Sequence, residues 1–268
     1  MSYYSRDCIS LERASQMIPA LVSEPHHSRS ARYEHIPTIS ILRALEKEGF
    51  SIHGLTTAKV RNGDRNGFQK HLVRLRRPEH AARDEAPEVV LINSHDGSSS
   101  YQLLCGMIRF ACANGLIVGD TWSNVRVKHT GKDLIGQVIE GTYSVVENFD
   151  RLAGRVDEMK AITLAPAEQE AFAEAAMSLR YSDENPSPIS APRLLMARRK
   201  EDVRADLWTV FNRIQENIIK GGQRGIIHEP GKVPRNASVR AVNGIDGNVK
   251  LNQALFTLAE SMAKLKAA

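Results

Sequence analysis

Two strand-like stretches on either side of a turn rich in Asn and Gly constrain this chain most. Residues 51–61 read SIHGLTTAKVR, residues 62–67 read NGDRNG, and residues 68–77 read FQKHLVRLRR. β-Branched and apolar residues favour strands, and Asn-Gly pairs favour the tight turn that reverses a strand. The pattern predicts a β-hairpin, so at least part of the fold is an antiparallel sheet.

Further strand and helix patterns surround this hairpin. The run VVLINS at 89–94 predicts a third strand that ends in the polar turn SHDGS, and residues 116–120 and 125–131 predict another strand pair. Helical spacing of apolar residues predicts helices at 38–50, 101–115, 132–160 and 166–179, and residues 1–22 form an apolar-patterned arm that we take as helical. These elements predict an α+β fold with an antiparallel sheet, a β-β-β-α core, covered by helices.

The best candidate for a domain boundary is SDENPSPISAPR at 182–193, which holds three prolines in twelve residues. We expect an α+β core domain over 1–181 and a helical C-terminal region over 194–268 that packs on it. In the second region, residues 201–222 and 249–268 predict helices, and residues 223–248 predict a long basic loop.

Composition narrows the class of protein. Lys plus Arg outnumber Asp plus Glu by 36 to 31, which modestly favours a polyanionic partner. No apolar run approaches the roughly 20 residues that span a bilayer, and the first residues do not resemble a secretory signal. Three cysteines form no even disulfide framework. We therefore expect a cytoplasmic protein with no membrane partner.

The cysteines do not predict a metal site. Cys105 and Cys112 are seven residues apart, on one face of the expected helix, with His95 and His129 in flanking segments. Structural zinc sites use closely spaced pairs such as C-x2-C, and free cysteines are commonly buried in cores. We predict core cysteines, no metal and no cofactor.

Catalytic motifs are absent or incomplete. The turn HDGSSSY lacks the G-x-S-x-G nucleophile pattern, and we expect Ser98 or Ser99 to cap the following helix. Neither phosphate-binding loop pattern is complete near GIIHEPGKV. Asp150 and the segment DEMK at 157–160 leave a metal-dependent nuclease open as an alternative, although they fit a solvated helix face better.

Basic residues give the clearest functional signal. In the predicted hairpin, Lys70, Arg74 and Arg76 share one strand face with Phe68, so that cations and an aromatic ring could follow a phosphate backbone and touch bases. Charges that guard a sheet edge against aggregation are the alternative reading. The expected nucleic-acid-binding residues are Arg61, Arg65, Phe68, Lys70, Arg74 and Arg76, with Arg109, Arg126 and Arg224 as further candidates.

Three stretches of the sequence resemble a known protein family. They are SHDGSSSYQLLCGMIRFACANGLIV, LWTVFNRIQENIIKGG at 207–222 and NGIDGNVKLNQALFTLAE at 243–260. From residue 37 to the C-terminus the chain resembles the uncharacterised phage/plasmid-like protein family of prophages, plasmids and integrative elements. The order of helix, hairpin, third strand and helix is also similar to the β-β-β-α core of Rad52-like single-strand annealing proteins, which implies binding of single-stranded DNA.

These observations predict a non-enzymatic single-stranded-DNA-binding protein of a mobile genetic element, acting in annealing, recombination or replication, and able to form a homo-oligomer. Two alternatives stay open. One is the metal-dependent nuclease, and the other is a protein-interaction module that inhibits host defence. With aromatic residues at only 6 % of the chain, few rings are available for base stacking.

The last predicted helix should be part of the fold. Leu251, Leu255 and Leu258 repeat at helical spacing. Deletion from Val249 onward should expose apolar surface and yield insoluble protein, or protein that binds a hydrophobic dye and lacks near-ultraviolet dichroism. A soluble truncation with an unchanged melting temperature would contradict this expectation.

Overall fold

The computed structural model describes residues 2–29, 33, 35, 37–60, 63–78, 85–110, 114–118, 124–129, 133–229 and 231–267. The chain divides into two compact units, residues 1–152 and residues 153–268. The proline-rich segment 182–193 lies inside the second unit. No helix among the described residues is both long and apolar enough to cross a membrane.

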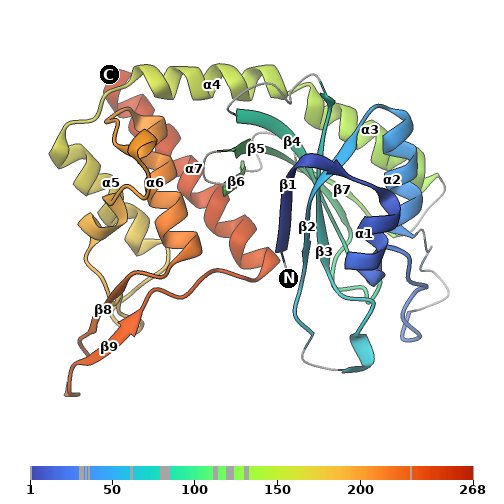
Figure 1. Ribbon diagram of the computed structural model, residues 1–268, viewed down its shortest axis with the longest axis horizontal. Coiled ribbons are helices and arrows are strands. Elements are labelled where there is room, and N and C mark those ends of the chain that lie inside the picture. The colour runs from blue at the N-terminus through green and yellow to red at the C-terminus, as the bar shows by residue number, and fades with distance from the viewer. Residues whose placement is uncertain are drawn as a thin grey trace. The chain divides into compact units, whose positions relative to one another are not determined.

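An antiparallel sheet forms the centre of the first unit (Figure 1). Its strands follow the order β1-β2-β3-β4-β5-β6, and β7 pairs with the first half of β5 while β6 pairs with the second half. The strands are β1 (Ser2–Ile9), β2 (Ser51–Thr57), β3 (His71–Arg76), β4 (Glu85–Asn93), β5 (Tyr101–Arg109), β6 (Asn114–Ile117) and β7 (Asn124–Val127).

Helices cover one face of this sheet (Figure 1). They are α1 (Leu11–Met17), α2 (Thr38–Lys47) and α3 (Leu134–Val146), with the short 3-10 turns η1 (Pro19–Leu21) and η2 (Gly63–Arg65) in the connections. Helix α3 packs on β5 and β7, and α2 packs on α3. The apolar stripe of α2 (Ile41, Leu42 and Leu45) is fully buried, as expected for an amphipathic helix on a sheet.

The second unit is mainly helical. Its elements are α4 (Phe149–Ala161, which begins in the first unit), α5 (Pro166–Ser178), η5 (Ala191–Leu195), η6 (Lys200–Asp202), α6 (Leu207–Lys220), β8 (Arg224–Ile227), β9 (Arg235–Ser238) and α7 (Ile245–Ala267). Helix α6 is capped by Asp206 and is buried along nearly its whole length. Helices α5 and α7 pack on α6, and Phe256 of α7 meets Phe211 of α6 edge to face.

The predicted fold class is confirmed: the protein is α+β, with an antiparallel sheet, covering helices and a C-terminal helix. The predicted hairpin is β2–β3, and the predicted third strand is β4. The helix predicted at 101–115 is wrong, because residues 101–109 form strand β5. Both faces of β5 are buried, so its apolar run has no polar alternation to mark it as a strand.

Other elements also differ from the prediction. The arm at 1–22 begins with strand β1, the helix predicted at 132–160 is interrupted at residues 147–148, and the basic loop at 223–248 contains a two-stranded ribbon. The turn SHDGS caps no helix. It closes the β4–β5 hairpin through an Asx turn, in which Asp96 Oδ1 accepts from the Ser98 N–H (2.9 Å) beside Gly97 at φ +76°.

A buried polar network joins α2 to the ends of three strands. His71 Nδ1 lies 3.1 Å from the Gln69 carbonyl oxygen, so Nδ1 carries the proton and Nε2 accepts from the Thr38 hydroxyl (2.8 Å). Thr38 in turn accepts from the Asn93 amide (3.0 Å), and Asn93 Oδ1 accepts from His129 Nε2 (2.8 Å). The order of donors therefore fixes one tautomer for each of the two histidines.

Burial keeps this network neutral. It lowers the pKa of His71 to about 4 and that of the neighbouring His95 to about 3. An unfolded histidine has a pKa near 6.5, so between about pH 6.5 and pH 4 the unfolded chain binds more protons than the folded chain. The stability that these two side chains contribute is complete above pH 6.5 and is lost as the pH falls through that window.

We therefore expect the free energy of unfolding to fall between pH 7 and pH 5, by up to about 1.4 kcal/mol per pH unit for each histidine below its unfolded pKa. Urea denaturation at fixed ionic strength measures this slope. His71→Gln should make the profile shallower, whereas His228→Gln, at an exposed position, should leave it unchanged. A wild-type profile that is flat over this range would refute the assignment.

Candidate nucleic-acid interface

Arg74 and Arg76, two of the arginines expected to bind DNA, lie inside the first unit and share one carboxylate. Arg74 Nη1 donates to Glu88 Oε2 (2.8 Å), and Arg76 Nε lies 3.1 Å from Glu88 Oε1. The side chains of Arg76 and Glu88 are 1 % and 0 % exposed. Because a buried charge needs its counter-ion, neither guanidinium is available to neutralise a phosphate. We leave both arginines out of the candidate interface.

The curl of the sheet brings backbone carbonyl groups of two other strands to these arginines. Arg74 of β3 donates to the Gly115 carbonyl oxygen of β6 (3.1 Å), and Arg76 donates to the Ser5 carbonyl oxygen of β1 (2.8 Å). Strands in a sheet are about 4.8 Å apart, so a side chain of β3 can reach β6 only across a strongly curled sheet. A Cβ atom at Gly115 would lie 2.2 Å from Arg74 Cζ, so a larger residue there would displace the guanidinium from this position.

Glu88 is the residue that the sequence analysis missed, because the third strand was predicted to start at Val89. Strand β4 instead starts at Glu85, and the pairing of Arg74 with Val90 and Leu75 with Val89 places Arg76 opposite Glu88. The run VVLI has no polar alternation, so the sequence offers no signal that extends this strand backwards to Glu88. Burial lowers the pKa of Arg76, and the charge of Glu88 opposes that shift.

The other hairpin candidates lie at its turn end. Arg65 is about half exposed, with Nη1 3.8 Å from Asp96 Oδ2, and Phe68 meets the ring of His26 edge to face. Lys70 is partly exposed, and Arg61 lies outside the described residues. The structure therefore keeps Arg65, Phe68 and Lys70 at the surface of this end, apart from Arg74 and Arg76.

The remaining candidates occupy separate places. Arg109, at the end of β5, is largely buried, with Nε 4.0 Å from Glu85 Oε1. Arg126 is exposed on β7, on the same face of the chain as exposed Lys128. Arg224 is exposed on β8 in the second unit. The structure thus does not gather all the expected residues into one surface.

A second basic element is the exposed two-stranded ribbon of β8 and β9, which projects from the helices of the second unit (Figure 1). Its root is fixed by Gly221 and Gly222, whose φ angles of +62° and +92° favour glycine. Beyond them the Gly222 N–H donates to the Val239 carbonyl oxygen (2.8 Å), and the Val239 N–H donates to Gln223 (2.9 Å). The ribbon is therefore anchored directly to the end of α6.

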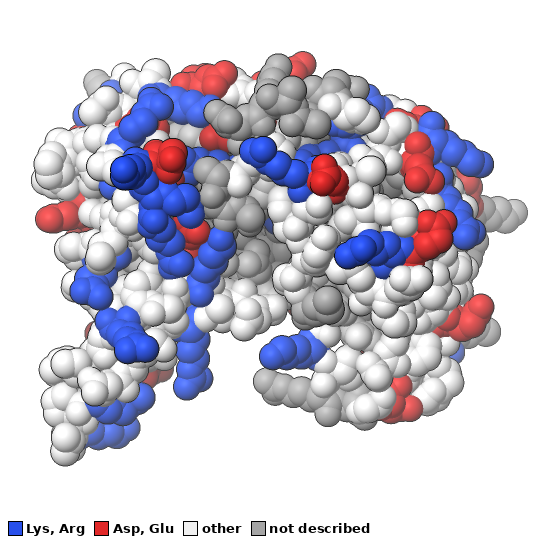
Figure 2. Space-filling model, in the orientation of Figure 1, with Lys and Arg blue, Asp and Glu red and all other residues white. Residues whose placement is uncertain are grey.

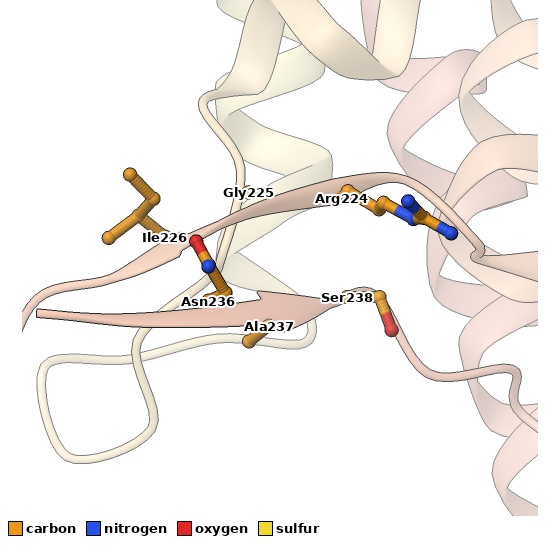
Figure 3. Close-up of a pocket in the computed structure, with 6 residues that line it drawn as sticks. All are labelled: Arg224, Gly225, Ile226, Asn236, Ala237 and Ser238. Atoms are coloured by element: carbon orange, nitrogen blue, oxygen red, sulfur yellow. The ribbon is translucent and has the colours of Figure 1, made fainter.

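Gly225 allows strand β8 to pack closely against the proline-rich segment 182–193. A Cβ atom there would lie 1.8 Å from the Pro188 carbonyl oxygen, so only glycine permits this approach. Both strands line an open pocket of about 600 Å³, with Arg224 and Ser238 near the root and Ile226 farther out (Figure 3). The pocket lining also includes Gly225, Asn236 and Ala237.

Cations dominate the ribbon. Residues 224–240 contain four Lys or Arg residues and a single acid, Glu229. Glu229 accepts from Lys232 Nζ (2.6 Å) and Arg235 Nη2 (3.2 Å), and these two bonds lower the pKa of its carboxyl group. Figure 2 shows Lys and Arg over the ribbon and the adjoining face of the second unit, with few acidic residues among them.

The ribbon also exposes apolar side chains. Val233, between the strands, is 87 % exposed, and Ile226 is 48 % exposed. Exposed apolar residues that are flanked by cations can contact bases or sugars while the cations contact phosphates. The ribbon thus presents side chains suited to both kinds of contact on one element of the fold.

The carboxylates of DEMK and the cysteine Cys105, which were considered as possible site residues, have structural surroundings in the fold. Asp157 and Glu158 of DEMK lie on α4 beside the cations of their own helix, Lys160 (3.7 Å) and Arg155. Cys105 is fully buried on β5, and burial raises the pKa of its thiol to about 12, which is the expected behaviour of a core cysteine. Cys112 lies outside the described residues.

Comparison with known proteins gives a consistent result. Residues 25–256 match a family model described as a domain of unknown function, DUF932. The chain is 44 % identical over 252 residues to the UPF0380 proteins YafZ and YfjQ of Escherichia coli (strain K12), covering 94 % of this chain and 90 % of each relative. No solved structure matches the chain. Membership of an uncharacterised family, expected from the sequence, is confirmed.

Removal of the charge of Glu88 should destabilise the first unit strongly. Glu88→Gln keeps the side-chain shape but leaves two arginines buried without a counter-ion, which should lower the free energy of unfolding by about 3–5 kcal/mol. Chemical denaturation at neutral pH measures the loss. The control is Glu158→Gln at an exposed ion pair, which should change little. A loss below about 1 kcal/mol for Glu88→Gln would show that the cluster does not depend on this charge.

Proposed function

Because this chain belongs to the DUF932 family, whose domain has no assigned function, we propose a function from its surface chemistry: the protein binds single-stranded DNA through the β8–β9 ribbon. The observation that carries the proposal is the excess of cations on this exposed, anchored element. Arg224, Lys232 and Arg235 would neutralise phosphates, and Val233 would contact bases or sugars.

The geometry of the ribbon favours a nucleic acid over a small anion. Its cations are distributed along two strands and the turn between them, so they match a row of phosphates better than a single phosphate group. The exposed side chain of Val233 can contact a base or a sugar, whereas a small anion has no apolar group that Val233 could contact. Since contacts to phosphates carry no sequence information, we expect binding with little sequence preference.

The annealing role and the link to mobile elements also belong to this proposal. The succession α2, β2, β3 and β4 in the first unit supports the likeness to Rad52-like annealing proteins. The helix that the likeness places directly after the third strand is strand β5 instead. The proposal of annealing, recombination or replication therefore depends on DNA binding being shown first.

The test is fluorescence anisotropy with labelled single-stranded and duplex oligonucleotides over a range of salt concentrations. For the wild type, log affinity should fall linearly with log salt concentration. The triple variant Arg224→Ala, Lys232→Ala, Arg235→Ala should reduce that slope by about two units, since each single-strand phosphate contributes about 0.7. Val233→Ser should weaken binding without changing the slope, because an apolar contact releases no counterions.

A matched control removes the same charges elsewhere. The triple variant Arg43→Ala, Arg151→Ala, Lys250→Ala changes two arginines and one lysine at exposed positions outside the ribbon, and it should keep the wild-type slope. A further variant, Arg65→Ala with Lys70→Ala, tests the turn end of the β2–β3 hairpin. No wild-type binding at low salt, or equal slopes for wild type and ribbon variant, would reject the ribbon as a DNA site. Tighter binding to the duplex would reject the single-strand preference.

A further inference from the structure

Three potential metal ligands meet in the first unit, far from the ribbon in the sequence. His26 Nε2 lies 3.0 Å from Asp64 Oδ2, and His27 Nε2 lies 3.9 Å from the same oxygen. One ligand atom of each residue lies within 4.8 Å of the other two. Two imidazoles and a carboxylate are a ligand set that suits Zn²⁺ and similar divalent ions.

The spacing of these atoms fits a tetrahedral ion. Zinc–ligand bonds of about 2.0–2.1 Å place neighbouring ligand atoms about 3.3 Å apart. The two distances from Asp64 Oδ2 to the histidine nitrogen atoms bracket that value, and each differs from it by about half an ångström or less. The two imidazole rings lie side by side, 4.1 Å between centroids and 32° between planes, so both rings reach the carboxylate from one side.

Contacts around His26 hold its ring in position for this role. Its side chain is 4 % exposed, Phe68 lies against its edge, and its backbone N–H donates to the His95 carbonyl oxygen (3.0 Å). Nδ1 lies 2.8 Å from the Ser28 hydroxyl oxygen. The Ser28 backbone N–H also donates to Nδ1 (3.2 Å), so in this structure Nε2 carries the ring proton and donates it to Asp64 Oδ2. A metal at Nε2 would displace that proton to Nδ1, where the Ser28 hydroxyl oxygen can accept it as the outer-shell partner typical of metal-binding histidines.

The other two ligands face solvent. The side chains of His27 and Asp64 are 75 % and 56 % exposed, so a water molecule or an external ligand can reach the fourth position. Asp64 lies in η2, between β2 and β3, whereas the histidines lie after η1. An ion bound here would join these two connections, which are already linked by the hydrogen bond from Ser23 Oγ to the Gly67 carbonyl oxygen.

We infer that His26, His27 and Asp64 form a binding site for a divalent ion of the zinc class, with water at the fourth position. The sequence does not predict this site, because His26-His27 is separated from Asp64 by more than thirty residues and no ligand spacing links them. The inference is independent of DNA binding by the ribbon.

The test titrates tag-free, metal-depleted protein with Zn²⁺ by calorimetry and with Co²⁺ by visible absorption. We expect one equivalent of Zn²⁺ and the d–d absorption of four-coordinate Co²⁺. His27→Ala and Asp64→Asn should each weaken Zn²⁺ binding at least about tenfold and remove the Co²⁺ band. Both positions are exposed, so the fold should survive, and circular dichroism of each variant checks that it does.

His228→Ala is the matched control, since it removes an exposed histidine from the second unit. This variant should keep the stoichiometry and affinity of the wild type. Failure to bind one equivalent of Zn²⁺ more tightly than about 100 μM, or equal affinities for the wild type, His27→Ala and Asp64→Asn, would overturn the inference.

Discussion

One buried carboxylate, Glu88, holds two arginines within the curled sheet of the first unit. Arg74 and Arg76 each bond to it and also to a backbone carbonyl of a distant strand, so the cluster links β1, β3, β4 and β6. Buried charges are costly to desolvate, and this arrangement is stable only when every partner is in place. The curl that brings Gly115 and Ser5 to the guanidinium groups is therefore part of the same interaction.

The helix-covered face of the same sheet is held by neutral hydrogen bonds instead of ion pairs. Side chains alternate along β3, so His71 faces α2 while Arg74 and Arg76 face away from it. On this face burial removes the charge of the histidines, and a chain of neutral hydrogen bonds connects Thr38, His71, Asn93 and His129. One face thus relies on paired charges and the other on fixed tautomers, and the loss of stability expected between pH 7 and pH 5 comes from the buried histidines.

Both proposed binding sites lie on connections that a rigid framework positions, as is common for functional residues. The ribbon is fixed at its root by two glycines and at its middle by the approach of Gly225 to Pro188, while its cations and Val233 are exposed. His26 is held by Ser28, Phe68 and His95, while His27 and Asp64 remain open to solvent. In each case, buried contacts orient groups that solvent can reach.

The sequence by itself determined the antiparallel hairpin, the third strand, the amphipathic helices and the α+β class, because these depend on local turn chemistry and on the period of apolar residues. It also located an excess of cations after α6. Only the tertiary structure decided that β5 is a strand, since a run that is buried on both faces has the same composition as a buried helix. Only the tertiary structure placed Arg74 and Arg76 against Glu88, because the pairing of β3 with β4 and the curl of the sheet are long-range properties. The same holds for His26 and Asp64, whose proximity depends on how two distant connections pack and not on their spacing along the chain.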